Sequence, residues 1–199
     1  MTRGHFIVFE GVDGCGKSTQ ARRFAVERGG RFAFEPGDSD LGAQLRTWLL
    51  DAHLDMTPRV EALLMLSDRS HHVTTVIEPT LDSGIDVVAD RFYPSTLAYQ
   101  GYGRGVPLAE LWAATRLAIG DCQPDLTILL DVDISVARSR GATRRDDRFE
   151  SVPGDFLDRV RQGYVEMAAE DPRRWAIVDG NRPEDEVADA VREVLAKRL

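Results

Sequence analysis

The chain has 199 residues and a net charge of −8, from 25 basic and 33 acidic side chains. This length suits one α/β domain with a buried core and is too short for two ordinary ones, so residues 1–199 are predicted to form a single domain. The acidic balance excludes the broad electrostatic footprint of a DNA- or RNA-binding protein, and we expect small phosphorylated molecules rather than a nucleic acid polymer as partners.

The first predicted strand leads directly into a phosphate-binding motif. Residues 6–9 are a continuous apolar run, which predicts a strand buried on both faces of a parallel sheet. Residues 11–18 read GVDGCGKS and fit the spacing G-x-x-x-x-G-K-[ST], and helical spacing follows over residues 20–28. Because backbone N–H groups at a helix N-terminus bind polyphosphates, we predict a nucleotide-phosphate site. Its residues are Gly11, Val12, Asp13, Gly14, Cys15, Gly16, Lys17, Ser18 and Thr19.

Several residues of this motif have an expected role. The glycines should let the backbone approach the polyphosphate without a Cβ in the way. Lys17 should place its charge near the β- and γ-phosphates, and Ser18 should offer its hydroxyl to Mg²⁺. Cys15 is either a thiolate favoured by the helix N-terminus or a small filler that points into the core.

The cysteines and the apolar runs predict where the protein works. The chain has two cysteines, Cys15 and Cys122, and a disulfide at Cys15 would block the phosphate site. We therefore expect a reducing compartment, the cytoplasm. The N-terminal apolar run is too short for a signal-peptide core, and no stretch approaches the roughly 20 apolar residues that span a bilayer, so no membrane association is expected.

Beyond the first helix, strands and helices are predicted in alternation. Strands are expected at 31–35, 85–90, 126–131 and 176–179. Helices are expected from about residue 40, with Leu41, Leu45, Trp48 and Leu49 on one face, and over 57–79, 107–119, 135–140, 155–171 and the C-terminus, with the second kinked or ended by Pro79. This alternation predicts a three-layer α/β/α fold of the P-loop NTPase class with a five-stranded parallel sheet. Ligands in such folds bind at the carboxyl ends of the strands.

The segment 90–105 is too polar and too rich in glycine for a simple connector, and we interpret it as a wall of the active site. Asp90, at the end of a strand, can hold Mg²⁺ or its waters, and Arg91 can bind a phosphate through two N–H groups. A local ion pair between these two residues is the alternative. Taken alone, Tyr99 and Gln100 fit a core aromatic and a surface amide equally well.

Several motifs together resemble those of bacterial thymidylate kinases over about residues 5–190. They are EGVDGCGKSTQ at 10–20, Glu-Pro-Gly at 35–37, Asp90-Arg91 with Ser95, AYQG at 98–101, GRG at 103–105 and PDLT at 124–127. The resemblance implies ATP-dependent phosphorylation of thymidine 5′-monophosphate, in dTTP biosynthesis, with ATP and Mg²⁺ as cofactors. It also implies a homodimer formed through the helix at 58–79.

The resemblance also implies an acceptor site. Arg46 and Arg91 match arginines that hold the acceptor phosphate, and Arg69 matches the arginine that reads the pyrimidine edge. Asp13 would lie near the sugar 3′-hydroxyl, and Tyr99 would pack on the deoxyribose. The implied substrate-binding residues are Asp13, Glu35, Pro36, Arg46, Met65, Arg69, Arg91, Ser95, Thr96, Tyr99 and Gln100.

Two positions depart from the family pattern. Met65 stands where many relatives have an aromatic that stacks on the base, and both base contact and core packing fit it. Phe34 stands where arginine is frequent, which removes one candidate phosphate contact.

An arginine-rich segment at about 138–152 resembles the mobile lid of the family. A solvated charged loop is the alternative. Some relatives carry an arginine at the position of Gly14, so here the transition-state charge is expected from Arg140, Arg144, Arg145 or Arg148 of the lid. The predicted catalytic residues are Lys17, Asp90, Arg140, Arg144 and Arg148, and the predicted metal ligands are Ser18 and Asp90.

Two other functions stay open from the sequence. A deoxynucleoside kinase would need a carboxylate base, for which Glu35 is available, but the arginine pair aimed at an acceptor phosphate argues against it. A GTPase-type switch would need an Asn-Lys-x-Asp segment, and the only asparagine, Asn181, is followed by Arg182.

Overall fold

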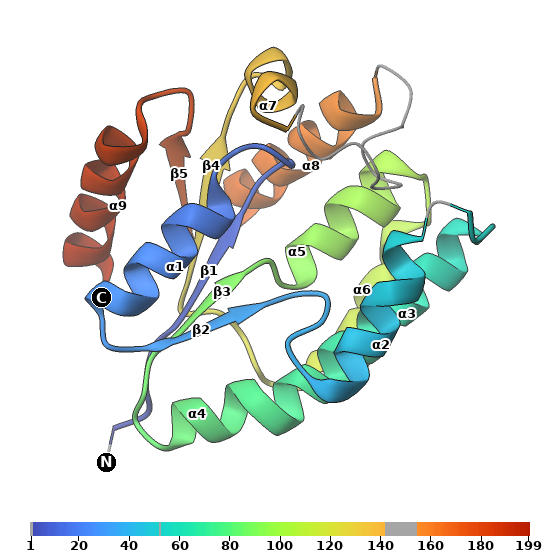
Figure 1. The fold of residues 1–199 in the computed structure, drawn as a ribbon, viewed down its shortest axis with the longest axis horizontal. Coiled ribbons are helices and arrows are strands. Elements are labelled where there is room, and N and C mark those ends of the chain that lie inside the picture. Colours follow the sequence, from blue (N-terminus) through green and yellow to red (C-terminus); the bar gives the residue numbers. More distant parts are fainter. Residues whose placement is uncertain (1, 52, 142–154) are drawn as a thin grey trace.

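The computed structural model describes residues 2–51, 53–141 and 155–199 (Figure 1). Within them, five parallel strands form one sheet in the order β2-β3-β1-β4-β5, which confirms the predicted fold class. The strands are β1 (Phe6–Glu10), β2 (Arg31–Phe34), β3 (Val87–Asp90), β4 (Leu126–Asp131) and β5 (Trp175–Asp179).

Helices connect the strands and cover the sheet (Figure 1). They are α1 (Lys17–Glu27), α2 (Asp40–Leu50), α3 (Pro58–His72), α4 (Glu78–Asp82), α5 (Tyr93–Thr96), α6 (Leu108–Ile119), α7 (Ile134–Gly141), α8 (Phe156–Glu170) and α9 (Glu184–Arg198). Two π-helical segments, Val73–Ile77 and Leu97–Gly103, join α3 to α4 and extend α5. No helix in the described parts of the chain is long and apolar enough to cross a bilayer.

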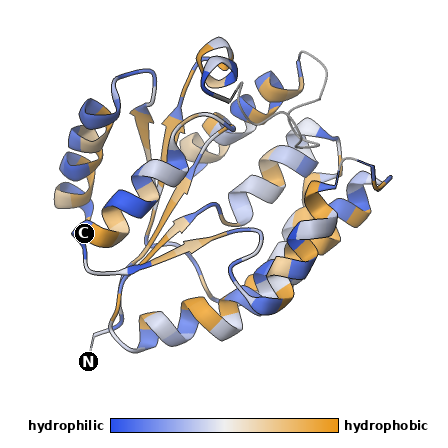
Figure 2. Cartoon of the chain, viewed as in Figure 1, coloured by the Kyte–Doolittle hydropathy of each residue, from blue (hydrophilic) through white to orange (hydrophobic). Residues whose placement is uncertain are grey.

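The central strand β1 is apolar from Phe6 to Phe9 because these side chains pack into two separate cores. Ile7 and Phe9 belong to the core that contains Phe24 of α1. Phe6 and Val8, which point to the opposite face, belong to a second core with Ile77. Alternate residues of a strand point to opposite faces, so a strand covered on both sides shows no polar alternation. Figure 2 shows the strands as largely hydrophobic, whereas the helices carry both hydrophobic and hydrophilic residues.

The long helix predicted over 57–79 differs from the expectation at its C-terminal part. It continues through the π-helical segment Val73–Ile77 and past Pro79 to Asp82, so the proline does not end it. Pro79 lies in the first turn of α4, where its missing N–H is tolerated.

The segment after β3, interpreted from its composition as a wall of the active site, is helical over 93–103. Glycines at 101 and 103 permit close packing of this helical segment. A Cβ at Gly101 would lie 2.5 Å from Leu108 Cδ2, and one at Gly103 would lie 2.5 Å from Phe156 Cε2. The segment therefore lies tightly against α6 and α8, with its polar side chains buried.

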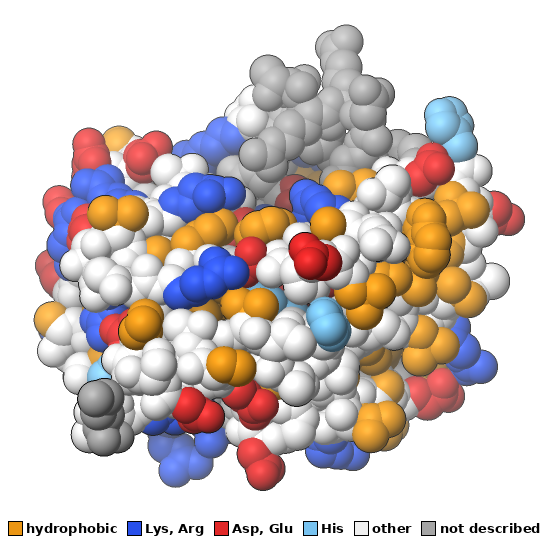
Figure 3. All heavy atoms as spheres, turned by 60° about the horizontal axis from the view of Figure 1, so that its bottom comes forward, with side chains coloured by type: hydrophobic (Ala, Val, Ile, Leu, Met, Phe, Trp, Pro, Cys, Tyr) orange, Lys and Arg blue, Asp and Glu red, His pale blue; other side chains and the backbone are white. Residues whose placement is uncertain are grey.

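Helix α2 buries only half of its predicted apolar face. Leu45 and Leu49 are buried, whereas Leu41 and Trp48 are exposed, the latter by 53%. On the neighbouring helix α3, Leu63 is also 53% exposed. In Figure 3 hydrophobic side chains gather on the right of the face shown, the side on which α2 and α3 lie in Figure 1.

Candidate active site

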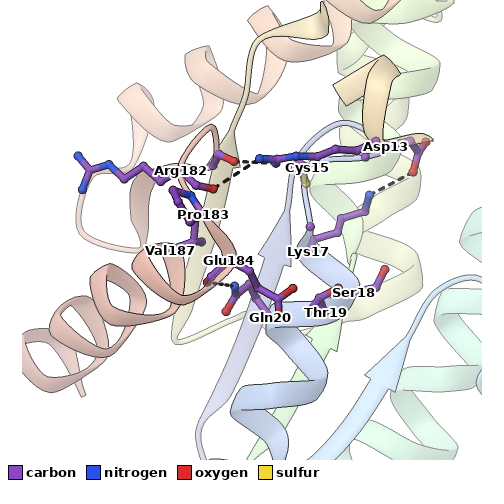
Figure 4. Close-up of a pocket in the computed structure, with 14 residues that line it drawn as sticks. Asp13, Cys15, Lys17, Ser18, Thr19, Gln20, Arg182, Pro183, Glu184 and Val187 are labelled. Carbon is purple, nitrogen blue, oxygen red and sulfur yellow. Dashed lines mark hydrogen bonds and ion pairs between the residues drawn. The ribbon is translucent and has the colours of Figure 1, made fainter. Parts of the chain in front are cut away.

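Two cavities adjoin the phosphate-binding motif. The donor-side cavity, about 390 Å³, lies between residues 13–20 and the loop at 180–187 (Figure 4). The acceptor-side cavity, about 440 Å³, lies against β2, α2, α3 and the segment that follows β3. Both cavities are lined by Asp13, Lys17 and Ser18. A ligand in each cavity would thus meet the other at these three residues.

The glycines of the motif do not all serve the purpose predicted for them. All three have a positive φ, which L side chains rarely adopt. However, a Cβ at Gly14 would lie 2.2 Å from the Ala137 carbonyl oxygen, and one at Gly11 would lie 2.7 Å from the Leu130 carbonyl oxygen. At Gly11 and Gly14 the missing side chain therefore leaves room for neighbouring backbone atoms rather than for a ligand. Of the three motif glycines, only Gly16 has open space beside it.

Not every motif residue faces the donor-side cavity. Gly11 and Val12 do not line it, whereas residues 13–19 do. Helix α1 begins at Lys17, three residues before the predicted start, so the motif runs directly into its N-terminus. The partial positive charge of that helix end is directed at the cavity.

Lys17 is buried and points toward Asp13 (Figure 4). Its Nζ donates to the Val12 carbonyl oxygen at 3.3 Å and to Asp13 Oδ1 at 3.1 Å. The ammonium group is therefore held at the junction of the two cavities.

Both cysteines are buried free thiols. Burial raises the pKa of the Cys15 thiol, an effect that the nearby Lys17 only partly opposes. Burial also raises the pKa of Cys122 to about 12. Its place in the core cluster and its burial favour Cys15 as a small core filler over the reactive thiolate.

Arg91 links the motif to the acceptor side. Its Nη2 donates to Asp13 Oδ1 at 2.6 Å and to the Tyr99 hydroxyl at 3.2 Å, and the Tyr99 hydroxyl donates to Asp13 Oδ2 at 2.8 Å. Although burial alone would raise it, Arg91 and Lys17 hold the pKa of Asp13 well below its usual range. The partner of Arg91 is thus Asp13 rather than Asp90, which contradicts the local ion pair considered from the sequence.

A buried carboxylate interacts electrostatically with Arg91. Glu10, at the end of β1, is fully buried and accepts from the Phe92 N–H at 2.8 Å, Ser95 Oγ at 2.7 Å and the Tyr164 hydroxyl at 2.9 Å. Burial raises its pKa, while Arg91 opposes that rise. Sequence reasoning did not single out Glu10 or Tyr164. An acidic residue that ends an apolar strand is a usable signal for Glu10, but Tyr164 comes from α8, remote in sequence.

Asp90 is suited to a hard cation. Its Oδ1 is buried and has no hydrogen-bond partner among the described residues, and its side chain lines the acceptor-side cavity together with Ser18. A carboxylate and a hydroxyl are oxygen ligands of the kind that Mg²⁺ takes, with waters and substrate phosphates completing its shell. No cluster of three or more His, Cys, Asp or Glu side chains poised for a metal occurs in the part of the chain that the structure describes.

Arg69 is fixed by a buried network. Its Nε donates to Glu35 Oε2 at 2.7 Å, its Nη1 to Thr96 Oγ1 at 2.8 Å and its Nη2 to the Phe92 carbonyl oxygen at 3.0 Å. The other Glu35 oxygen lies 3.0 Å from His72 Nδ1. Arg69 is thus not on a solvated helix face, and both oxygens of Glu35 are occupied.

Gln100 is likewise buried and held in place. Its Nε2 donates to Glu61 Oε1 at 2.8 Å, and Arg104 Nε donates to the same oxygen at 2.8 Å. This arrangement excludes the surface amide that the sequence alone left open for Gln100.

The structure brings all of the predicted acceptor residues together around one cavity. They are Asp13, Glu35, Pro36, Arg46, Met65, Arg69, Arg91, Ser95, Thr96, Tyr99 and Gln100. Met65 both lines this cavity and packs on the core, and Arg46 Nη1 donates to the Pro36 carbonyl oxygen at 2.6 Å. Arg22, Phe34 and Leu50 also line the cavity and were not predicted to do so.

Only part of the predicted lid lies within the described residues. Arg140, on α7, lines the donor-side cavity and donates to the carbonyl oxygens of Gly180 at 2.8 Å and Asn181 at 3.3 Å. Arg144, Arg145 and Arg148 lie outside the described residues.

Comparisons with known proteins agree on one family. The family model for thymidylate kinase matches residues 9–191. The thymidylate kinase of Clavibacter michiganensis subsp. michiganensis is 44% identical over 201 residues, which cover 95% of this chain and 93% of that protein. The thymidylate kinase of Burkholderia cenocepacia (strain HI2424) is 44% identical over 206 residues, which cover 98% of this chain and 99% of that protein. A crystal structure of thymidylate kinase from Ehrlichia chaffeensis superimposes with a TM-score of 0.78 at 30% identity, covering 97% of this chain and 99% of that one.

Proposed function

This chain belongs to the thymidylate kinase family and phosphorylates thymidine 5′-monophosphate to the diphosphate, and we propose that ATP in the donor-side cavity is the phosphoryl donor. The observation that carries this assignment of the cavities is that both are lined by Asp13, Lys17 and Ser18. A γ-phosphate bound at the motif would face an acceptor phosphate across these residues. In-line transfer needs this positioning and the neutralisation of charge.

The cations at the junction would supply that charge. Lys17 and Arg91 both bond to Asp13, so their positive groups are held at the meeting point of the two cavities. On binding, Lys17 would bond to the β- and γ-phosphates, and Arg91 with Arg46 would hold the acceptor phosphate. Groups fixed in advance of the reaction lose little energy in reorganising, and this favours the transition state.

Ser18 and Asp90 would hold Mg²⁺. The bound ion supplies neutralisation of charge on the donor phosphates. The buried, unpartnered Asp90 oxygen supports this assignment, because a carboxylate oxygen left without a donor is costly unless a cation binds to it.

Arg140 would contribute from the donor side. Its bonds to the carbonyl oxygens of the 180–182 loop place the guanidinium on the wall of the donor-side cavity. We assign transition-state stabilisation to Arg140, Arg144 or Arg148. Changing each arginine singly to alanine should lower turnover more than it weakens acceptor binding, and wild-type turnover in all of the variants would refute the assignment.

The buried network disfavours a deoxynucleoside kinase. That activity needs a carboxylate free to take a proton from a neutral hydroxyl. Glu35 bonds to Arg69 and His72 through its two oxygens and is therefore committed to structure.

A coupled phosphotransfer assay over a panel of nucleosides and nucleoside monophosphates tests the proposal. Turnover of ATP should be fastest with thymidine monophosphate, and deoxyuridine monophosphate should react more slowly, since one methyl group contributes about 1–3 kcal/mol. Ribothymidine monophosphate should be rejected more strongly if Tyr99 closes the 2′ position, and Tyr99→Ala should relax this. Turnover with thymidine itself, but not with its monophosphate, would refute the proposal.

We further propose that residues 1–199 act as one domain in a cytoplasmic homodimer. The two free cysteines support a reducing compartment. Exposed Trp48 and Leu63 on the adjacent helices α2 and α3 support an interface there, since exposed apolar patches often mark sites of association.

A further inference from the structure

The orientation of the Gln100 amide is determined by its neighbours. A glutamine amide has a donor end and an acceptor end of nearly equal size, and either can in principle face a ligand. Here Nε2 donates to Glu61 Oε1 at 2.8 Å, and Gln100 lines the acceptor-side cavity. Its carbonyl oxygen is the end that remains for the ligand.

Arg104 makes this orientation obligatory. Its Nε donates to the same Glu61 oxygen at 2.8 Å, and its guanidinium lies 5.5 Å from the centre of the Phe156 ring. A guanidinium can only donate, so the shared oxygen accepts on both sides. An accepting oxygen selects the NH₂ end of Gln100. Glu61 is 1% exposed, so water does not compete for this contact.

Arg69, which lines the same cavity, provides hydrogen-bond donors where Gln100 provides an acceptor. The guanidinium of Arg69 has only donors and is locked by Glu35, Thr96 and the Phe92 carbonyl. Three of the five N–H donors of Arg69 are used in these bonds, and both Arg69 and Gln100 line the acceptor-side cavity. Donors from Arg69 together with an acceptor from Gln100 match a ring edge with a carbonyl oxygen next to an N–H. Thymine and uracil have this edge. Cytosine has an amino group next to an unprotonated ring nitrogen, which reverses the pattern.

We propose that Glu61 is a positioning residue that, together with Arg104, fixes the Gln100 carbonyl oxygen toward the base and so favours thymine and uracil over cytosine. The inference rests on the proposed function, because it takes the acceptor-side cavity to be the site of the base. Glu61 acts through Gln100.

The test compares two substitutions at this position. Glu61→Met removes the acceptor at similar volume and leaves the Arg104 N–H groups to attract the Gln100 carbonyl oxygen, which turns the amide. In Glu61→Gln, the new amide oxygen can still accept from both Arg104 and Gln100. The readout is the ratio of kcat/KM for thymidine monophosphate to that for deoxycytidine monophosphate.

We expect Glu61→Met to lower this ratio about tenfold or more, mainly through the acceptor KM, and Glu61→Gln to keep it within about threefold of the parent. Removing one partner of a buried ion pair is usually destabilising, whereas replacing both partners with apolar groups of similar volume is often tolerated. If Glu61→Met does not fold, the double variant Glu61→Met with Arg104→Met replaces both partners of the pair and should lower the ratio at least about threefold.

A double-mutant cycle and a control complete the test. In a Gln100→Ala background, Glu61→Met should leave the ratio unchanged, because the amide through which it acts is gone. Glu110→Met is the matched control: it breaks the exposed pair with Arg59, 3.0 Å long, between α6 and α3, and should not change the ratio. Equal losses with both nucleotides in Glu61→Met, or an equal effect in the Gln100→Ala background, would overturn the inference. If the parent itself does not turn over thymidine monophosphate, the proposed function fails instead.

Discussion

At the scale of single residues, Asp13 holds together the cationic groups that we propose for phosphoryl transfer. It accepts from Lys17, Arg91 and the Tyr99 hydroxyl, so it orders two cations before any phosphate is present. In the proposed reaction, bound phosphates would replace Asp13 as the anionic partner of these cations. This would reduce the reorganisation that otherwise adds to the barrier.

The first prediction concerns Lys17. Lys17→Ala should lower turnover about a hundredfold or more, because it removes a charge contact to the transferring phosphoryl group. The fold should survive, since Asp13 keeps its partners Arg91 and Tyr99. Lys197→Ala, an exposed substitution on α9, is the control for both turnover and thermal unfolding. Near-normal turnover of Lys17→Ala would remove the motif from catalysis.

The second prediction concerns the pH dependence of stability. Burial alone would lower the pKa of His72, but its bonds to Asp38 and Glu35 raise the pKa to about 9. The folded pKa exceeds the ordinary value of 6.5, so this stabilisation is complete below about pH 6.5 and is lost as the pH rises through 9. It is worth on the order of 3 kcal/mol.

Urea unfolding at pH 6 and pH 9.5 checks this. The free energy of unfolding of the parent should exceed that of His72→Gln by much less at pH 9.5 than at pH 6. His53→Gln, at an exposed position, should have the free energy of unfolding of the parent at both pH values. A constant difference between the parent and His72→Gln would show that His72 is not charged in the folded protein.

At the scale of elements, the phosphate-binding motif and α7 form one packed unit. Gly14 touches the backbone of Ala137, and Arg140 from the same helix lines the donor-side cavity. The motif therefore depends on a helix more than 100 residues away in sequence.

The third prediction follows from this contact. Gly14→Ala would place a Cβ 2.2 Å from the Ala137 carbonyl oxygen at a φ of +83°, so it should cost more than about 2 kcal/mol of unfolding free energy and raise the KM for ATP. Gly29 also has a positive φ, but a Cβ added there would have no atom within 4 Å. Gly29→Ala should therefore cost only about 1 kcal/mol of unfolding free energy. Equal stability of the two variants, measured by urea unfolding, would contradict a clash.

Sequence alone predicts the order of strands and helices because β1 and its neighbours carry strong apolar runs. Through motif resemblance it also predicts a set of residues that the structure brings together around the acceptor-side cavity. It fails where packing gives a residue a different purpose. The composition of 90–105 does not reveal that Gly101 and Gly103 serve close helix packing, and Tyr164 reaches Glu10 only through the fold. Likewise, the sequence does not show which carboxylate pairs with Arg91, because Asp13 reaches it only in the folded structure.

At the scale of the whole molecule, apolar side chains on α2 and α3 face outward on one side (Figure 3). The acceptor-side cavity is lined by residues of the same two helices, among them Arg46 and Arg69. A second copy packed there would cover the apolar side chains and brace the back of the acceptor-side cavity.

The fourth prediction tests this interface. Leu63→Glu should convert a dimer into monomers at micromolar concentration, because a desolvated charge in an apolar contact is costly. Val26→Glu, at an 82% exposed position on α1, is the control and should leave the mass unchanged. Sedimentation velocity gives the answer, and a monomeric parent or a dimeric Leu63→Glu would contradict the prediction.

The junction at Asp13, Lys17 and Ser18 has a consequence for inhibitor design. Because these three residues line both cavities, a short anionic linker laid along them would join a donor mimic to an acceptor mimic in one compound. Once one half is bound, the other is presented to its cavity at a high effective concentration, so such a compound should bind by a factor of about 10² to 10⁴ more tightly than either half. Selectivity would come from the requirement that one compound fit both cavities at once.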